Sequence, residues 1–204
     1  MAFSKLSIIN DALTLLGTNR ITSLADGSTE SAVMNQIFDG VQDSVARSFA
    51  WNCLTNRTEL AREVSTPAYG FDFQYALPTD PYCIRVLEMN ETNNTDKWKV
   101  EGRKILSNAS TCKIKFIGRP DSLGDIDSLL AQAITARLAA DAAYTLVQSN
   151  NVTQLMWQLY SQKLAEAQSI DQIESSRDHF ISTRLEDARS GLGSDTTRFG
   201  KAWW

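Results

Sequence analysis

The stretch that decides the fold is LLAQAITARLAADAAYTLV, residues 129–147. Small or apolar side chains occupy most of the circumference of the helix that this pattern predicts over residues 128–148. Small side chains let neighbouring helices approach closely, and a helix that is apolar on most faces belongs at the centre of a domain. We therefore expect this segment to be a buried, central helix.

Three further segments, residues 4–16, 29–50 and 153–185, show helical periodicity, because their apolar residues recur every three or four positions. Gly17 suits the left-handed position that ends a helix. Each helix pair alone would leave an apolar stripe exposed, so we expect the pairs to pack together. The residues that we expect in one helical core are Leu13, Ile37, Val45, Trp51, Leu138 and Leu159.

The period changes from 3.6 to 2 at about residue 70. In YGFDFQYALP, residues 69–78, apolar and polar side chains alternate, which is typical of a strand with one buried face. KWKVEGRKIL, residues 97–106, predicts a hairpin that turns at Glu101 and Gly102. We therefore expect a small antiparallel meander over residues 70–118.

These patterns predict a mainly α fold with a small β insertion: a four-helix core, an antiparallel β-meander and an extended C-terminal arm. The helical core domain comprises residues 1–69 and 119–185, and the β-rich insertion comprises residues 70–118. Residues 186–204 lose all periodicity and carry glycine and serine, so we expect a flexible arm there.

The totals exclude some classes of protein. The net charge of -4 favours no nucleic-acid groove, which needs clustered lysine and arginine. No apolar run approaches the roughly 18 residues of a membrane helix, so we expect no membrane partner. Asn10 and Asp11 interrupt the apolar N-terminal stretch, which therefore predicts a mature helix rather than a signal peptide.

The sequence also contains no recognisable motif of a catalytic, metal or cofactor site. Cys53, Cys83 and Cys112 form no CxxC pair or zinc cluster, so we expect free thiols in a reducing compartment and no metal or cofactor. Asp125 and Asp127 precede a predicted helix and suit a cap better than an acid/base pair. We therefore predict that the protein is not an enzyme.

Three stretches together carry a resemblance: INDALTLLGTNRITSLADGSTESA (residues 9–32), SFAWN (48–52) and YALPTDPYCIRVLEM (75–89). In order and spacing they resemble the head-to-tail adaptor, or tail tubular protein A, family of short-tailed bacteriophages. The resemblance spans about residues 6–170. The matching residues are Asn10, Ala12, Leu13, Leu16, Gly17, Ile21, Ser23, Leu24, Trp51, Asn52, Tyr75, Leu77, Pro78, Asp80, Val86 and Gly102.

The resemblance implies a structural virion protein of the neck or tail, made in the host cytoplasm. Members of that family form a twelve-fold ring between the portal protein and the tail nozzle protein. The ring closes the packaged head and continues the channel through which DNA passes without sequence-specific binding. Two other classes stay open as alternatives: a helical binding module or assembly chaperone, and an enzyme with an unrecognised site.

The chain ends in TTRFGKAWW, residues 196–204, and aromatic side chains make good anchors at interfaces. We expect Phe199, Trp203 and Trp204 to fill apolar pockets of a portal subunit, with Arg198 and Lys201 meeting acidic groups at the rim. The alternatives are a tail that packs on its own helices or on a neighbouring adaptor subunit.

Four charged residues of the predicted helices are candidates for the subunit or channel face of the ring. A closed ring needs two different contacting faces on each subunit. Substituting these residues is expected to alter ring formation and to leave the stability of the monomer nearly intact. The four are Asp39, Asp43, Arg47 and Arg137.

Overall fold

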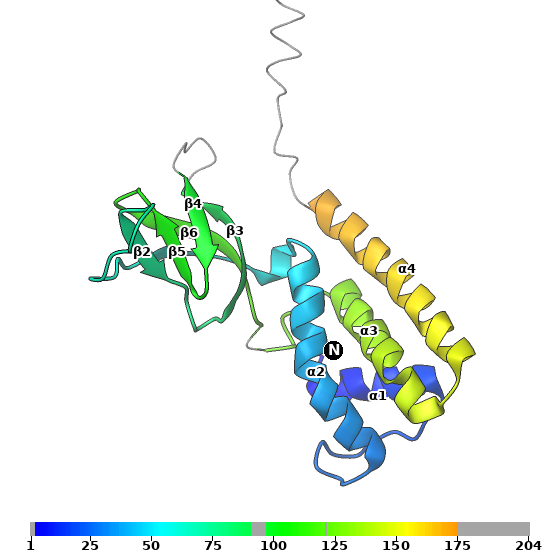
Figure 1. Cartoon of the computed structure of the whole chain (residues 1–204). Helices are drawn as coiled ribbons and strands as arrows, with labels where there is room; N and C mark the ends of the chain where they lie inside the picture. The colour runs from blue at the N-terminus through cyan, green and yellow to red at the C-terminus, as the bar shows by residue number, and fades with distance from the viewer. Residues whose placement is uncertain (1–2, 91–96, 121, 175–204) are drawn as a thin grey trace, which may run out of the picture. The chain divides into compact units, whose positions relative to one another are not determined.

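The computed structural model describes residues 3–90, 97–120 and 122–174, and residues 1–172 form one compact unit separate from residues 173–204. The expected arm, residues 186–204, lies outside the described residues. Figure 1 shows the order of the elements. The helices are α1 (Lys5–Leu16), α2 (Thr29–Ser48), the short 3-10 helix η1 (Asn52–Leu54), α3 (Ser128–Val147) and α4 (Asn150–Glu174). The strands are β1 (Thr55–Leu60), β2 (Phe73–Ala76), β3 (Cys83–Met89), β4 (Trp98–Glu101), β5 (Lys104–Ser107) and β6 (Cys112–Gly118).

The helix α3 is central, as its composition predicts. Both α1 and α2 pack against it, and Figure 1 shows it between α2 and α4. Leu138 and Ala139 are fully buried. The helix begins after Asp127, whose carboxylate accepts hydrogen bonds from the backbone N–H groups of Leu129 (2.8 Å) and Leu130 (3.2 Å). Asp127 is therefore the helix cap that the sequence predicted.

The connection from α1 to α2 is held by short polar contacts. Gly17 ends α1 in the left-handed conformation (φ 68°), which costs glycine no strain. The Asn10 side chain then clamps the loop: its Nδ2 donates to the carbonyl of Ile21 (2.9 Å) and its Oδ1 accepts from the Ile21 N–H (2.8 Å). This two-way bond fixes where the chain turns toward α2.

The predicted fold class is wrong. The structure is a mixed α/β fold, with 48% helix, 21% strand and two three-stranded antiparallel sheets, and it does not show a four-helix core. α4 contributes only one stripe, in which Met156, Tyr160 and Ala167 are buried. The helical core also takes side chains from outside the four α-helices, namely Ile21, Trp51, Leu54, Ile117 and Ile126. Helical periodicity shows that a helix has an apolar face, but it does not show what covers that face.

The single predicted meander is likewise replaced by two sheets, with strand orders β1-β6-β3 and β2-β5-β4. In the first sheet β6 lies between two strands from earlier in the chain, and Thr55 of β1 stands opposite Ile117. The strand β1 lies before residue 70, and its polar sequence TNRTEL carries no clear alternation of apolar residues. A second hydrophobic core is formed by Tyr75, Leu77, Cys83, Met89, Ile105, Cys112, Ile114 and Phe116.

The strands are joined to the helical core through the first sheet. Ile84, Leu87 and Ile117 of that sheet pack against the helical core. Of the six residues expected in that core, four are buried, namely Leu13, Val45, Trp51 and Leu138. Ile37 and Leu159 are only partly buried at its edge.

No helix in the described part of the chain combines the length and the apolarity needed to cross a bilayer.

Candidate functional site

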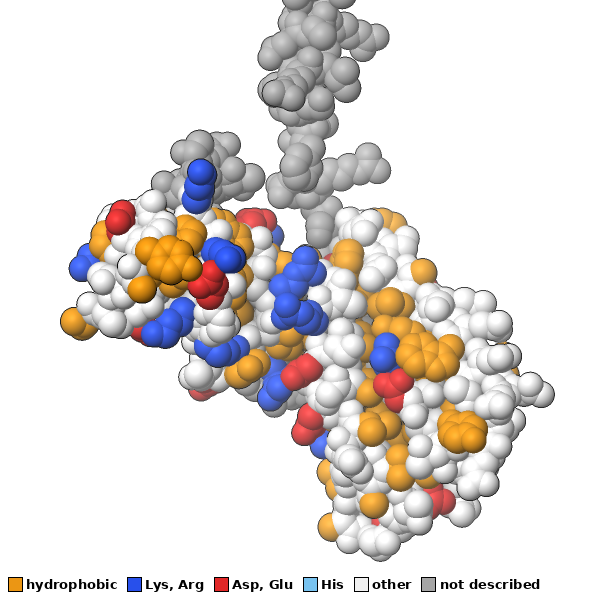
Figure 2. Space-filling model, in the orientation of Figure 1, with side chains coloured by type: hydrophobic (Ala, Val, Ile, Leu, Met, Phe, Trp, Pro, Cys, Tyr) orange, Lys and Arg blue, Asp and Glu red, His pale blue; other side chains and the backbone are white. Residues whose placement is uncertain are grey.

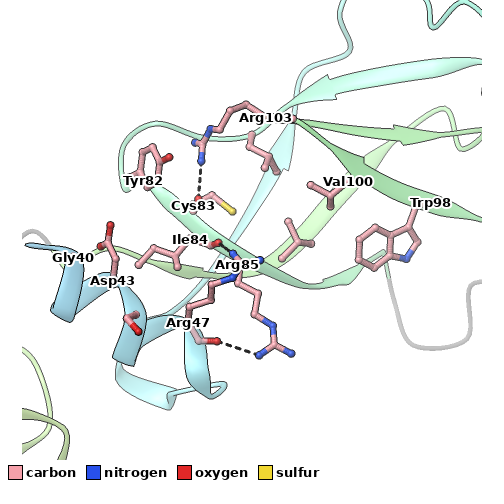
Figure 3. Close-up of a pocket in the computed structure, with 14 residues that line it drawn as sticks. Gly40, Asp43, Arg47, Tyr82, Cys83, Ile84, Arg85, Trp98, Val100 and Arg103 are labelled. Atoms are coloured by element: carbon pink, nitrogen blue, oxygen red, sulfur yellow. Dashed lines mark hydrogen bonds between the residues drawn. The ribbon is translucent and has the colours of Figure 1, made fainter. Parts of the chain in front are cut away.

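A pocket of about 800 Å³ lies where β3 and β4 meet one face of α2 (Figure 3). We call it the seam groove. The helix contributes Gly40, Asp43, Ser44 and Arg47 to its wall, and the strands contribute mainly Ile84, Arg85, Val86, Trp98 and Val100, with Arg103 from the turn after β4. The wall therefore combines apolar side chains with three arginines.

The groove exists because β3 and β4 are edge strands. Each pairs on one side only, β3 with β6 and β4 with β5. On the far side of the strands the two sheets are joined, because Arg62 bridges to Tyr75 and the N–H of Glu63 donates to the carbonyl of Gln74 (3.0 Å). Among the described residues, the strands thus enclose their core and leave a seam between β3 and β4 that no ladder closes.

Arg103 closes one end of this seam. It follows Gly102, whose left-handed backbone (φ 59°) makes the tight turn between β4 and β5. Its guanidinium donates to the carbonyls of Cys83 (2.7 Å) and Pro78 (2.8 Å). It also lies over the ring of Tyr82, 3.9 Å from the centroid, which is close enough for a cation–π interaction.

A second arginine cluster ties α2 to β3. Arg47 donates from Nη1 to the carbonyl of Ile84 (2.5 Å), and Arg85 donates from Nη1 to the carbonyl of Arg47 (3.3 Å), as Figure 3 shows in part. Asp43 forms a bidentate pair with Arg119, with 2.9 Å between Nε and Oδ1. The hydrogen bond to Asp43 raises the pKa of Arg119.

The groove is positively charged. Asp43 of α2 is the acidic residue among those that line it, and its carboxylate is already paired with Arg119. Among the described residues, Arg47, Arg85 and Arg103 form no ion pair with a carboxylate. Their bonds to carbonyls use only some of the donors that each guanidinium carries, so the groove can bind carboxylates or other oxyanions.

Cys83 is the thiol of this groove. Burial raises its pKa, while the positive charges of Arg103 and Arg47 act in the opposite direction. Its side chain is therefore a neutral thiol at pH 7, which is a poor nucleophile. Within the described ranges, no group of three histidine, cysteine or carboxylate side chains is placed to hold a metal ion.

A second exposed surface lies along α3 and α4. Arg137 pairs with Asp141 (3.0 Å) and lies over the ring of Trp157, 4.5 Å from the centroid. Figure 2 shows large hydrophobic side chains gathered over this part of the molecule. The exposed apolar residues of these helices include Tyr144, Leu155, Trp157 and Ile170. We call this the α3–α4 surface.

The four charged residues predicted for a subunit or channel face are not all brought together. Asp43 and Arg47 both line the seam groove. Asp39 pairs with Lys5 of α1 at 3.2 Å, and Arg137 belongs to the α3–α4 surface. The residues predicted to dock on the portal, Arg198, Phe199, Lys201, Trp203 and Trp204, lie outside the described residues.

Sequence reasoning missed two arginines of the groove, Arg85 and Arg103, and the partner of its Asp43, Arg119. Arg85, Arg103 and Arg119 come from β3, from a hairpin turn and from the residue after β6, so no local pattern groups them. The basic residues are scattered along the chain, so the sequence predicted no cluster of them. The strand β3 gives no local signal for Arg85 either, because its pairing with β6 shifts register between Cys83 and Arg85 and again between Val86 and Glu88.

No protein-family model matches this chain, and a search of curated proteins finds no match to it either.

Proposed function

We propose that this protein is a structural virion subunit that forms a ring between portal and tail. In this role the ring closes the packaged head, continues the DNA channel and carries the tail nozzle. The observation that carries the proposal is the presence of two different exposed surfaces on one compact unit, the seam groove and the α3–α4 surface. A closed ring is built from heterologous contacts, in which one face of a subunit meets a different face of the next.

The chemistry of the two surfaces supports this role. The α3–α4 surface offers aromatic and aliphatic side chains beside one arginine, the combination that is enriched at protein interfaces. The seam groove offers arginines and two strand edges that no further strand covers within residues 3–90, 97–120 and 122–174. Each surface therefore has the composition of a contact with another protein chain.

The residues that carry the family resemblance add a second line of support. Asn10 and Gly17 set the turn after α1. The Tyr75 hydroxyl donates to the carbonyl of Ala109 (2.6 Å), and the Trp51 indole N–H donates to the carbonyl of Val45 (3.1 Å). Because these residues hold turns and element ends, the resemblance concerns positions that determine a fold rather than a variable surface.

The proposal is tested by mixing the purified protein with the portal protein of the same virus and measuring particle mass by mass photometry. We expect portal particles to gain mass in steps that saturate at one adaptor per portal subunit, and electron microscopy to show a ring on one portal face. A monomer in the absence of portal agrees with the proposal. A mixture that stays as two separate species at micromolar concentration contradicts it.

The C-terminal part of the proposal needs its own variant. Truncation after Ala188 is expected to leave a folded, soluble protein that no longer binds portal, because it removes Phe199, Trp203 and Trp204 together with their basic neighbours. Trp203→Ala with Trp204→Ala in the full chain is the matched control for the aromatic anchors alone. Portal binding at unchanged affinity after truncation would show that the arm has another partner.

A further inference from the structure

The seam groove is bordered by two strand edges that pair with no other strand in the described part of the chain. β4 is the last strand of its sheet and β3 is the last strand of the other, and among the described residues no ladder joins them. An open strand edge presents unpaired N–H and C=O groups, and proteins usually cover it or use it to bind another chain. Here the edges face a pocket of about 800 Å³ rather than a packed core.

The register of the hairpin shows which backbone groups face the groove. Glu101 stands opposite Lys104 across the two-residue turn, and Val100 stands opposite Ile105. The residues that flank such a turn form the hydrogen-bonded pair, and the next pair in an antiparallel ladder does not. The backbone N–H and C=O of Val100 therefore point away from β5, toward the open side of β4.

The edge of β3 is already partly capped. The carbonyls of Cys83 and Ile84 accept hydrogen bonds from Arg103 and Arg47. These bonds protect the start of β3, whereas the outward groups of β4 have no such cover among the described residues. An added strand therefore has β4 as its template.

The side chains around this edge define the chemistry of an added strand. Val86, Trp98 and Val100 provide apolar contacts, and Val100 is 40% exposed. Arg47 and Arg85 lie across the groove from β4, as Figure 3 shows, without a carboxylate partner in the described part of the chain. A segment that alternates apolar and acidic residues matches both features, because successive side chains of a strand point to opposite faces.

We propose that the seam groove binds an extended acidic segment of a partner protein, which adds as a strand to the free edge of β4. Its backbone pairs with the outward groups of β4, as in other cases of strand addition. Its carboxylates bind Arg85 and Arg47. A nucleic acid would satisfy the arginines but not the strand edge or the apolar wall. The inference stands on the groove alone and does not depend on the ring-forming role.

The test uses the full chain and a fluorescein-labelled peptide of eight residues in which glutamate alternates with valine and threonine. Fluorescence anisotropy at about 0.1 M salt is expected to show saturable binding. The same peptide with lysine in place of glutamate is expected not to bind. A labelled eight-nucleotide oligothymidylate is the nucleic-acid probe, and analytical ultracentrifugation reports self-association.

Two variants of the protein locate the site. Arg85→Glu is expected to weaken peptide binding at least tenfold, because it reverses a charge in the groove. Arg57 is an exposed arginine of β1 that does not line the groove. Arg57→Glu therefore makes the same charge change outside the groove and is expected to leave the affinity for the peptide within twofold. Val100→Pro removes one outward N–H, which an edge strand tolerates, and is expected to weaken binding at least fivefold.

Several outcomes overturn the proposal: no binding of the acidic peptide, equal losses in Arg85→Glu and Arg57→Glu, or binding that Val100→Pro leaves unchanged. Tighter binding of the oligonucleotide, abolished by Arg85→Glu, would make the groove a nucleic-acid site instead. Self-association that Arg85→Glu abolishes would make its occupant a second copy of this chain. Circular dichroism checks each variant, and Arg85→Gln replaces Arg85→Glu if the latter unfolds. None of these results bears on whether the protein binds portal.

Discussion

The helix α3 buries eleven of its twenty residues, whereas the edge strand β4 buries none of its four. Alanines let α1 and α2 approach α3 closely, so most of this helix is covered by its own chain. The strand β4 pairs with β5 on one side, and no strand of the described ranges pairs with its other side. The comparison teaches that burial is concentrated in the helical core, while β4 presents exposed side chains at the edge of its sheet.

The largest expected effect is in the helical core. Leu138→Ala removes a fully buried side chain from α3 and is expected to lower the free energy of unfolding by about 2–5 kcal/mol. Urea denaturation followed by tryptophan fluorescence measures it. Leu155→Ala, on an exposed leucine of α4, is the matched control and should change stability by about 0.5 kcal/mol or less. Equal effects of the two variants would show that α3 is not the centre of the core.

The next largest expected effect on stability concerns Arg103, at the closed end of the seam. Arg103→Ala removes two hydrogen bonds to backbone carbonyls and the contact with Tyr82. We expect it to lower the free energy of unfolding by about 2 kcal/mol. Arg103→Lys keeps the charge but loses the planar fork, so most of the loss should remain. Hydrogen exchange should speed up at the start of β3. Full stability in Arg103→Lys would show that charge alone holds this end.

A smaller effect on stability is expected for the ion pair between Asp43 of α2 and Arg119, the residue after β6. Asp43 and Arg119 are partly exposed, so a double-mutant cycle with alanine at each position should give a coupling of about 1 kcal/mol. This differs from the expectation, drawn from the sequence, that charge changes at Asp43 and Arg47 leave monomer stability nearly intact. A coupling near zero, measured by thermal unfolding at low salt, would restore that expectation.

The last effect is absent at neutral pH, appears only at alkaline pH and concerns the core between the sheets. Burial raises the pKa of Cys112 from 9.0 to about 11. The folded protein therefore holds this proton more tightly than the unfolded chain, so stability is complete below pH 9 and falls as the pH rises toward 11. Unfolding measured from pH 8 to 11 should show a steeper fall in the native protein than in Cys112→Ala. Parallel curves would place Cys112 in a more polar setting.

Local chemistry accounts for what could be predicted from the sequence. The ends of α1 and α3 were readable because Gly17 and Asp127 act on backbone groups within a few residues. The β4–β5 hairpin was readable because its turn needs Gly102. The pairing of β1 with β6 could not be predicted from the sequence, because it joins segments far apart in the chain. The strand β1 also has no strong alternation of apolar and polar residues.

The candidate site follows the same division. Asp43 and Arg47 could be singled out as solvent-facing charges of a helix. The partners that make them a site, Arg85, Arg103 and Arg119, are brought to them only by the folding of the strands onto α2. Nothing in the local sequence of any of these arginines sets it apart from the other exposed basic residues of the chain.

The sequence by itself determined that α3 is buried, where α1 and α3 begin and end to within about one residue, and that β4 turns into β5. These features depend on side-chain size, periodicity and backbone conformation within a few residues. Only the tertiary structure decided that the strands form two sheets with an open seam between β3 and β4, and that arginines gather around it. Sheet pairing and charge clustering depend on contacts between distant segments, whose partners no local pattern specifies.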